Sequence, residues 1–168
     1  WPIYENPYSD RMVDRARLAI APDGTVHVVW VESYFPETFS LLGIRYASSR
    51  DGGTTWSEAL SLADGPYDWP EIAVRGEDEV HVVWSGTASD RFKFHRWSDD
   101  GGKSWFPVWR NTALGGLQGW PALVLDGDQT LYWIQVGDVF GIPPDTSTTT
   151  DKLYYQYWPV SYTHLTLP

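Results

Sequence analysis

The chain has 168 residues and a formal net charge of −10, because 22 acidic residues oppose 12 basic ones. This balance argues against nucleic acid as a partner, since phosphate binding needs a basic surface. It argues equally against adhesion to an anionic membrane, and no apolar run approaches the ~20 residues of a membrane helix. We therefore expect no membrane insertion.

A strand–turn–strand pattern occurs three times along the chain. Residues 18–30, 72–84 and 123–135 each combine an alternating strand, a turn rich in Asp and Gly, and a second strand. Trp30 and Trp84 are 54 residues apart, and the third copy follows after 51 more. The turn residues tolerate the positive φ angles of tight hairpins.

A third strand is predicted in each copy, at 43–48, 91–97 and 152–158. In the first two copies it runs into a second repeated segment, at 49–56 and 98–105. We expect a fourth strand to begin at the tryptophan that ends each of these segments.

Four short strands in each unit of about 50 residues is the spacing of a β-propeller blade. The predicted fold is therefore all-β, a partial propeller of about three four-stranded antiparallel blades. The blades are expected at 16–62, 70–110 and 121–158.

The spacing of the same repeat predicts what lies at both ends of the chain. Trp1 precedes the first repeated strand by 17 residues, close to the spacing after the two later tryptophans. We therefore expect an outer strand of an earlier repeat at 1–6, and an incomplete propeller over 1–159. Residues 160–168 resemble the translation of a transposon-end adapter from sequencing libraries, and we interpret them as a non-native tail.

The second repeated segment has the pattern Ser-x-Asp-x-Gly-x-x-Trp, complete in two copies. Its residues are Ser49, Asp51, Gly53 and Trp56, and then Ser98, Asp100, Gly102 and Trp105. The pattern resembles the Asp box, or bacterial neuraminidase repeat, of the sialidase-like β-propellers. The resemblance covers nearly all of residues 1–159.

The Asp-box residues are expected to be structural. Short Ser and Asp side chains accept hydrogen bonds from the amides of their own turn. The second glycine of each box allows a φ that a side chain would forbid. We therefore interpret Asp51 and Asp100 as residues that hold a turn, in preference to catalytic acids. The resemblance places such boxes at the edge of the propeller, away from the ligand.

A ligand is expected at the opposite end of the blades, where the connections between blades meet the loops between second and third strands. Charged and aromatic residues gather there in the sequence. The candidate ligand-face residues are Asp14, Arg15, Arg17, Glu32, Tyr34, Asp68, Trp69, Glu71, Arg91 and Trp120. The alternative is that the two Trp-Pro pairs seal adjacent blades and that the charges are solvated surface.

Metal and cofactor chemistry is not expected. Cysteine is absent, which excludes a disulfide framework and a thiolate site. The four histidines have no metal-ligand spacing. His27 and His81 lie at equivalent positions of the repeat, which favours packing over ligation.

The resemblance implies a sialidase-like glycoside hydrolase acting on extracellular glycans. Such enzymes hold the substrate carboxylate with three arginines and use a Tyr nucleophile assisted by a Glu, with an Asp as acid and base. The chain departs from this pattern: Arg-Ile-Pro is missing before the first strand, and Asp14 stands at the arginine position. No catalytic residue is therefore assigned.

Three functions remain open. The first is a sialidase-like hydrolase, and the second is a non-catalytic propeller that binds a glycan, sialylated or not, or a protein. The third is another Asp-box glycan hydrolase with paired carboxylates in its cleft. Asp-box proteins of these kinds are commonly exported, so the expected location is extracellular or in the cell envelope.

Overall fold

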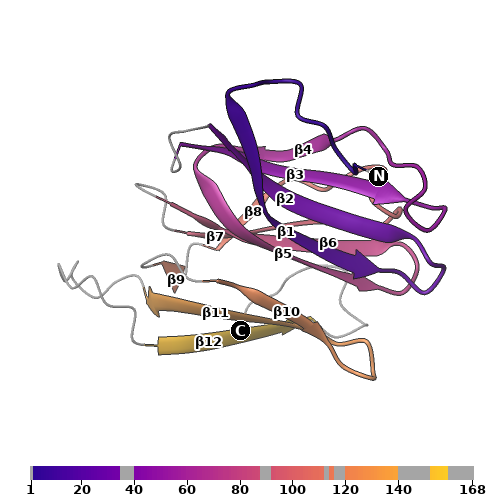
Figure 1. Cartoon of the computed structure of the whole chain (residues 1–168). Helices are drawn as coiled ribbons and strands as arrows, with labels where there is room; N and C mark the ends of the chain where they lie inside the picture. Colours follow the sequence, from indigo (N-terminus) through magenta and orange to yellow (C-terminus); the bar gives the residue numbers. More distant parts are fainter. Residues whose placement is uncertain are drawn as a thin grey trace.

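The computed structural model describes residues 2–34, 40–87, 92–111, 114–115, 120–139 and 152–158, and these residues fold into β-strands and connecting turns (Figure 1). The strands are β1 (Arg11–Ile20), β2 (Val26–Tyr34), β3 (Leu41–Ser49), β4 (Leu60–Asp64), β5 (Tyr67–Arg75), β6 (Glu79–Gly86), β7 (Lys93–Ser98), β8 (Trp109–Asn111), β9 (Leu114–Gly115), β10 (Ala122–Leu125), β11 (Leu131–Val139) and β12 (Lys152–Trp158). Within these ranges, no helix is long and apolar enough to cross a membrane.

The strands form antiparallel sheets in the order of the sequence. The first sheet has the order β1-β2-β3-β4 and the second has the order β5-β6-β7-β8. β10, β11 and β12 follow the same order in a third sheet, and β9 pairs with the far end of β11. The prediction of an all-β fold with four-stranded antiparallel sheets is confirmed.

Several predicted boundaries differ from the observed ones. β12 begins and ends as predicted, whereas β4 and β8 begin at Leu60 and Trp109, four residues after the tryptophans at which they were expected. The reason is that Trp56 and Trp105 still belong to their turns, because each indole N–H donates to a backbone carbonyl of its own box.

The beginning of the chain also differs from the prediction. β1 extends back to Arg11, and residues 2–10 contain no strand, although one was expected at 1–6. This segment lies beside the first sheet without joining a ladder: the ring of Tyr4 packs on that of Trp30 at 5.3 Å. The side chain, and not the backbone, attaches it.

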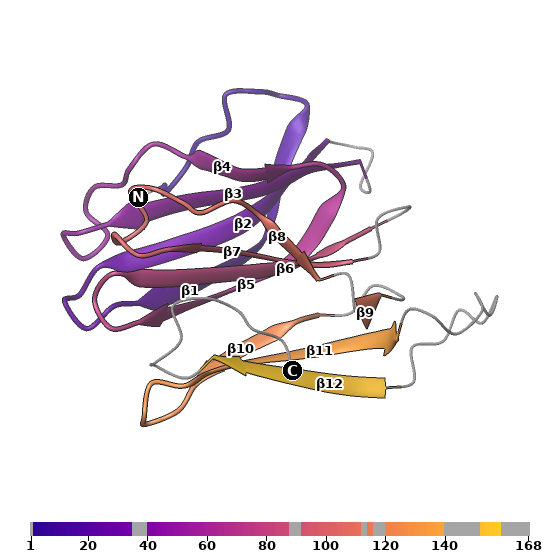
Figure 2. The ribbon, with the colours of Figure 1, turned by 180° about the vertical axis from the view of Figure 1, so that it is seen from behind.

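The sheets pack face to face, because alternate residues of each strand point to opposite faces. Between the first two sheets, one face of β2 contributes Val29 and Val31, and β5 contributes Ile72 and Val74. Between the second and third sheets, Val83 packs with Leu131 and Trp133. Figure 2 shows this succession of sheets from behind. β1 also contacts β5, and β5 contacts β10, so the first strands of consecutive sheets are neighbours.

Tyr46 links the first sheet to the Asp box of the second. Its ring meets that of Trp105 at 4.9 Å, nearly edge-on at 74°. Its hydroxyl lies 2.7 Å from Nδ1 of buried His27. A Cβ on Gly102, whose φ is +82°, would overlap this hydroxyl. The glycine therefore permits both the turn and the approach of the two sheets.

Replacing Gly102 is expected to be more harmful than replacing a glycine of similar φ in open space. Gly24 has a φ of +88° and nothing within 4 Å of its added Cβ. Gly24→Ala should cost only backbone strain, about 1 kcal/mol. Gly102→Ala should cost about 2–4 kcal/mol, because Tyr46 is held by His27 and must also move. Urea unfolding monitored by tryptophan fluorescence measures both, and equal losses would contradict the packing role.

Acid is expected to destabilise the fold through its buried histidines. Burial lowers the pKa of His27 and of His81, and burial with the nearby charge of His81 holds the pKa of His95 well below 6.5. A depressed folded-state pKa means that the unfolded chain binds more protons below pH 6.5. Stability should therefore be constant above that pH and fall below it.

The size of this effect can be measured with one substitution. His95 should contribute about 1.4 kcal/mol of lost stability per pH unit below its unfolded pKa. Urea midpoints between pH 8 and pH 5 should show the fall, and His95→Gln should make the slope shallower. A midpoint that is independent of pH across this range would refute the burial of neutral histidines.

Candidate functional site

A β-bulge occurs at equivalent positions of β1 and β5. The register of β1 with β2 shifts between Asp14 and Arg17, and that of β5 with β6 shifts between Asp68 and Glu71. Both bulges contain a non-glycine residue in the left-handed region, a conformation that costs of order 1–3 kcal/mol. Such strained backbone persists only where the surroundings hold it.

An aspartate holds each strained residue. Arg15 has a φ of 53°, and its backbone N–H donates to Oδ1 of Asp14 at 2.7 Å. Trp69 has a φ of 50°, and its backbone N–H donates to Oδ1 of Asp68 at 2.8 Å. The two repeats therefore use the same Asp-to-next-amide bond to fix the direction of the residue that follows.

The two bulges are joined by ion pairs between the first and second sheets. Nε of Arg15 lies 3.0 Å from Oδ1 of Asp68, and its Nη1 lies 2.7 Å from Oδ2 of Asp14. One guanidinium thus bridges two carboxylates. Beside it, Nε of Arg17 donates to Oε1 of Glu71 at 2.8 Å.

Two tryptophans extend the cluster from the second sheet to the third. The ring centres of Trp69 and Trp120 are 5.4 Å apart with an interplanar angle of 70°. Trp120 stands in the third repeat where Trp69 stands in the second, and it is 66% exposed. The ring of Trp120 therefore contacts Trp69 and leaves the rest of its surface exposed.

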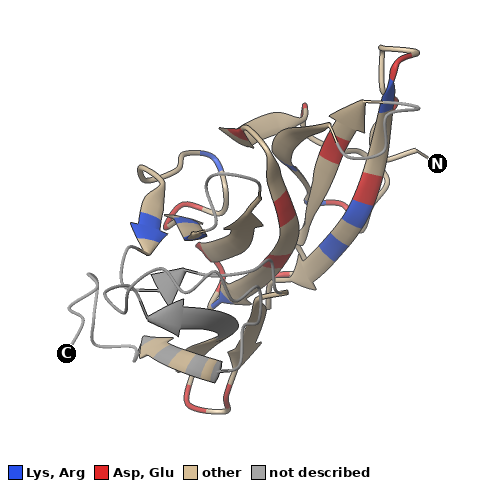
Figure 3. Ribbon diagram, turned by 90° about the vertical axis from the view of Figure 1, so that its left-hand side faces the viewer, with Lys and Arg blue, Asp and Glu red and all other residues tan. Residues whose placement is uncertain are grey.

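We call this cluster the bulge site. It consists of Asp14, Arg15, Arg17, Asp68, Trp69, Glu71 and Trp120. Figure 3 shows charges of both signs along the strands that form it. Seven of the ten predicted ligand-face residues therefore come together.

Asp68 has an unusual environment within the bulge site. Burial raises its pKa, although the amide of Trp69 and the charge of Arg15 act in the opposite direction. The negative charge of Asp14 raises the pKa further. A carboxyl whose pKa is raised by burial and a neighbouring carboxylate is chemically suited to donate a proton.

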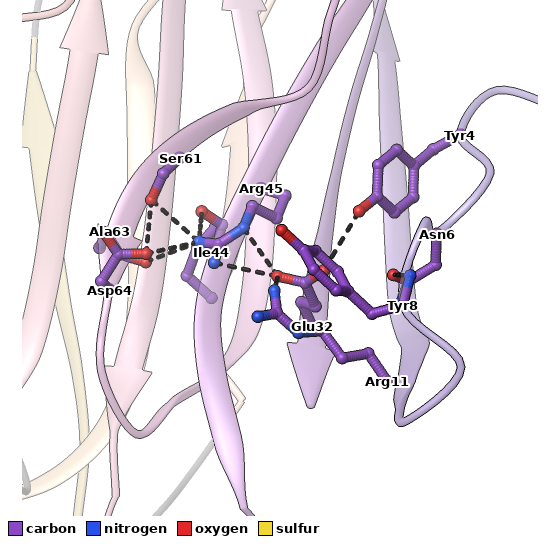
Figure 4. Close-up of polar contacts among 10 residues, drawn as sticks. All are labelled: Tyr4, Asn6, Tyr8, Arg11, Glu32, Ile44, Arg45, Ser61, Ala63 and Asp64. Carbon is purple, nitrogen blue, oxygen red and sulfur yellow. Dashed lines mark hydrogen bonds and ion pairs between the residues drawn. The ribbon is translucent and has the colours of Figure 1, made fainter. Parts of the chain in front are cut away.

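Glu32 and Tyr34 lie outside the bulge site, and Arg91 lies outside the described residues. Glu32 is buried, and its carboxylate accepts hydrogen bonds from Tyr4 at 3.2 Å and from Nε of Arg45 at 3.1 Å (Figure 4). Nη1 of Arg11 lies 3.4 Å from it. This set attaches residues 2–11 to the first sheet and gives Glu32 a structural role.

Both Asp boxes have the turn hydrogen bonds expected of them. In the first, the hydroxyl of Ser49 donates to Asp51 at 2.8 Å and accepts from the amide of Gly53 at 2.8 Å. The amide of Thr55 donates to Asp51 at 2.8 Å. In the second, the corresponding bonds of Ser98, Asp100, Gly102 and Ser104 measure 2.7, 2.9 and 2.8 Å.

These bonds determine the protonation of the box carboxylates. Hydrogen bonds from Thr55 and Ser49 lower the pKa of Asp51 to about 2, and those from Ser104 and Ser98 do the same for Asp100. Carboxylates that remain ionised to such a low pH are poor proton donors. The box carboxylates therefore stabilise their turns and are poorly suited to general acid chemistry.

Some contacts were not predicted from the sequence. Tyr4, Arg11 and Arg45 were not singled out, because their shared partner Glu32 is distant from all three in the sequence. The bulges were also missed. The sequence does mark them, because the two repeats have an Asp at the same position, 54 residues apart. Among the described residues, no group of three or more His, Asp or Glu could hold a metal ion.

No family model matches the chain, and no curated protein is detectably similar to it.

Removing the Asp68 carboxylate is expected to destabilise the site in a graded way. Asp68→Asn keeps an acceptor for the amide of Trp69 but loses the ion pair with Arg15. Asp68→Ala loses both and leaves a buried amide without its acceptor, at a cost of about 1–3 kcal/mol. Urea unfolding should rank wild type above Asn and Asn above Ala. An alanine variant as stable as wild type would show that the bulge does not depend on this bond.

Proposed function

We propose that the chain is part of a β-propeller of Asp-box repeats, similar to the sialidase-like glycoside hydrolases. The described residues form no closed ring. The proposal is supported by the repeated meander order, by two Asp boxes with equivalent bonds, and by sheets that stack through their faces. The neighbouring first strands β1, β5 and β10 would then line the axis.

The function that the geometry supports best is glycan binding at the bulge site. The exposed ring of Trp120, set against Trp69, carries this proposal. The faces of sugar rings stack on indoles, while carboxylates and guanidinium groups hydrogen-bond to their hydroxyls. The bulge site presents both kinds of group within one cluster, which is the composition expected of a site for a polar ligand with apolar faces.

The arrangement of charges favours a neutral glycan over a sialylated one. Arg15 faces Asp14 and Asp68, and Arg17 faces Glu71. A guanidinium already paired with a carboxylate has less capacity to bind the carboxylate of a sialic acid. Sialic acid would thus have to displace an existing ion pair, whereas a neutral sugar would not.

Hydrolysis is the second candidate function. It is favoured by the raised pKa of Asp68 and by the second carboxylate, Asp14, on the same guanidinium. Two carboxyl groups in different environments are the usual requirement for glycoside hydrolysis. For either function the proposed location is extracellular or in the cell envelope, with glycans as partners and no role for nucleic acid.

Removing the exposed indole is expected to weaken glycan binding. Trp120→Ala should lower the affinity for neutral oligosaccharides about fivefold to tenfold, because one stacking surface is lost. Calorimetry or ligand-observed NMR with cello-, xylo- and sialyl-oligosaccharides measures this. Tyr8→Ala is the matched control, since Tyr8 is exposed and lies outside the bulge site.

The same panel separates binding from hydrolysis. Release of free sugar would show hydrolysis. If Asp68→Asn still binds the glycan but no longer releases sugar, the proton transfer is assigned to the Asp68 carboxyl. If a glycan binds and no sugar is released, the site binds glycans without hydrolysing them. If no glycan binds, or if Trp120→Ala binds as well as wild type, the proposal is wrong.

A further inference from the structure

Two histidines of the second sheet touch each other where that sheet packs against the third, a contact that we call the second junction. Nδ1 of His81 lies 3.0 Å from Nε2 of His95, and the two rings are stacked with their centres 5.2 Å apart. Both side chains are buried, and the ring of His95 also packs against Trp97 and against Trp133 of the third sheet. The third sheet therefore helps to keep the pair out of water.

Glu79 determines the tautomer of both rings. Burial raises the pKa of its carboxyl, but hydrogen bonds from His81 and Arg75 lower it to about 2, so Glu79 is ionised and can only accept. Nε2 of His81 lies 2.8 Å from Glu79 Oε1 and must therefore carry the hydrogen. A neutral imidazole has a single N–H, so Nδ1 of His81 accepts and Nε2 of His95 donates to it. Both neutral rings are thus Nε2–H tautomers.

The closed junction can take up one proton only by rearranging these bonds. If His81 becomes an imidazolium, both of its nitrogens donate, and Nε2 of His95 has to accept. A proton from water then binds Nδ1 of His95, while the proton on Nε2 of His95 passes to Nδ1 of His81. A second proton would place two positive rings in contact. The closed pair therefore takes up fewer protons than two free imidazoles.

The surroundings of the pair disfavour even the first proton. Burial lowers the pKa of His81 against the opposing effect of Glu79, and burial with the charge of His81 holds the pKa of His95 well below 6.5. Arg75 already pairs with Glu79, so the carboxylate is shared between the ring and a permanent cation.

The other side chains of the second junction offer little to a buried charge. The described charged and titratable side chains on this face of the second sheet are Asp68, Glu71, Arg75, Glu79 and Lys93. The described side chains that the third sheet contributes to the contact are Leu123, Leu125, Leu131 and Trp133. An imidazolium in this contact is therefore packed against apolar side chains, where a charge is costly.

The contact between the first and second sheets, the first junction, has a different pair. His27 is equivalent to His81, but Tyr46 stands at the position of His95, and its hydroxyl lies 2.7 Å from Nδ1 of His27. Burial raises the pKa of Tyr46 to about 12, so its hydroxyl stays neutral. A hydroxyl can donate or accept by rotating about its C–O bond. His27 can therefore gain a proton without a tautomer change in its partner.

We propose that His81 and His95 form a proton switch that releases the third sheet from the second in mild acid. In the released state the rings return to water, so this state binds more protons than the closed one and is increasingly populated below about pH 6.5. Above that pH the pair is neutral and the junction stays closed. The proposal goes beyond glycan binding and does not depend on it, because both histidines lie outside the bulge site.

Hydrogen–deuterium exchange on the full chain, corrected for the intrinsic pH dependence of exchange, tests the release. Amides of β10 and β11 report the second junction, and amides of β1 and β2 report the first. Between pH 7.5 and pH 5.5 the protection of β10 and β11 should fall at least about tenfold, because each imidazole with a lowered pKa contributes up to about tenfold per pH unit below 6.5. The protection of β1 and β2 should fall less. An equal loss in all four strands, or no loss in β10 and β11, would overturn the proposal.

His95→Tyr is the matched variant, because it gives the second junction the His–Tyr pair of the first. Its loss of protection in β10 and β11 should shrink to that of β1 and β2, and a loss as large as in wild type would contradict the switch. Near-ultraviolet circular dichroism establishes that the variant is folded. Nitrogen-15 NMR of the wild-type imidazoles needs no variant: at pH 8 both rings should be Nε2–H tautomers, and an Nδ1–H tautomer of either ring would refute the proposed hydrogen bonding.

Discussion

The fold depends on one constraint: each sheet has apolar side chains on both faces and therefore needs a neighbour on both sides. β2 shows this directly, because Val29 and Val31 pack towards the second sheet while Val28 and Trp30 pack on the opposite face. The middle sheet meets the requirement through the two sheets of its own chain. The side chain of Tyr4 meets it in part for the first sheet, where it covers Trp30. Stacking is thus the source of the core and of the exposed faces that remain at its two ends.

Stacking also positions the bulge site. β1, β5 and β10 are the first strands of consecutive sheets, so residues at one repeat position lie side by side without being close in the sequence. Because the repeats are in register, Arg15 meets Asp68 and Trp69 meets Trp120. Within a meander, the end of β2 and the β4–β5 connection lie at one end, whereas the first hairpin and the Asp box lie at the other. The strained residues of the bulges and the rigid turns of the Asp boxes therefore lie towards opposite ends of the strands.

Periodicity in the sequence was sufficient to predict most of the strands, because a half-buried strand imposes an alternation of two residues. β12, the two hairpins of 18–30 and 72–84, and the Asp-box turns all follow from local pattern. Prediction failed where the register changes or where the chain packs through single side chains. The bulge interrupts the alternation of β1 and hid its first residues, and Tyr4 holds residues 2–10 without a ladder. The partners of Glu32 could not be predicted, because tertiary packing alone brings them together.

The aspartates of the chain show how environment separates residues of one type into different chemical roles. Asp51 and Asp100 accept several hydrogen bonds while remaining close to water, so their pKa values fall to about 2 and they stay ionised. Asp68 also accepts an amide hydrogen bond and faces an arginine, yet burial and the charge of Asp14 raise its pKa. At the bulge, desolvation therefore changes the pKa more than hydrogen bonding does. At the turns, hydrogen bonding has the larger effect on the pKa. A motif that contains Asp does not indicate acid chemistry by itself; of these three carboxyls, the one with a raised pKa is that of Asp68, which the stacked sheets remove from water.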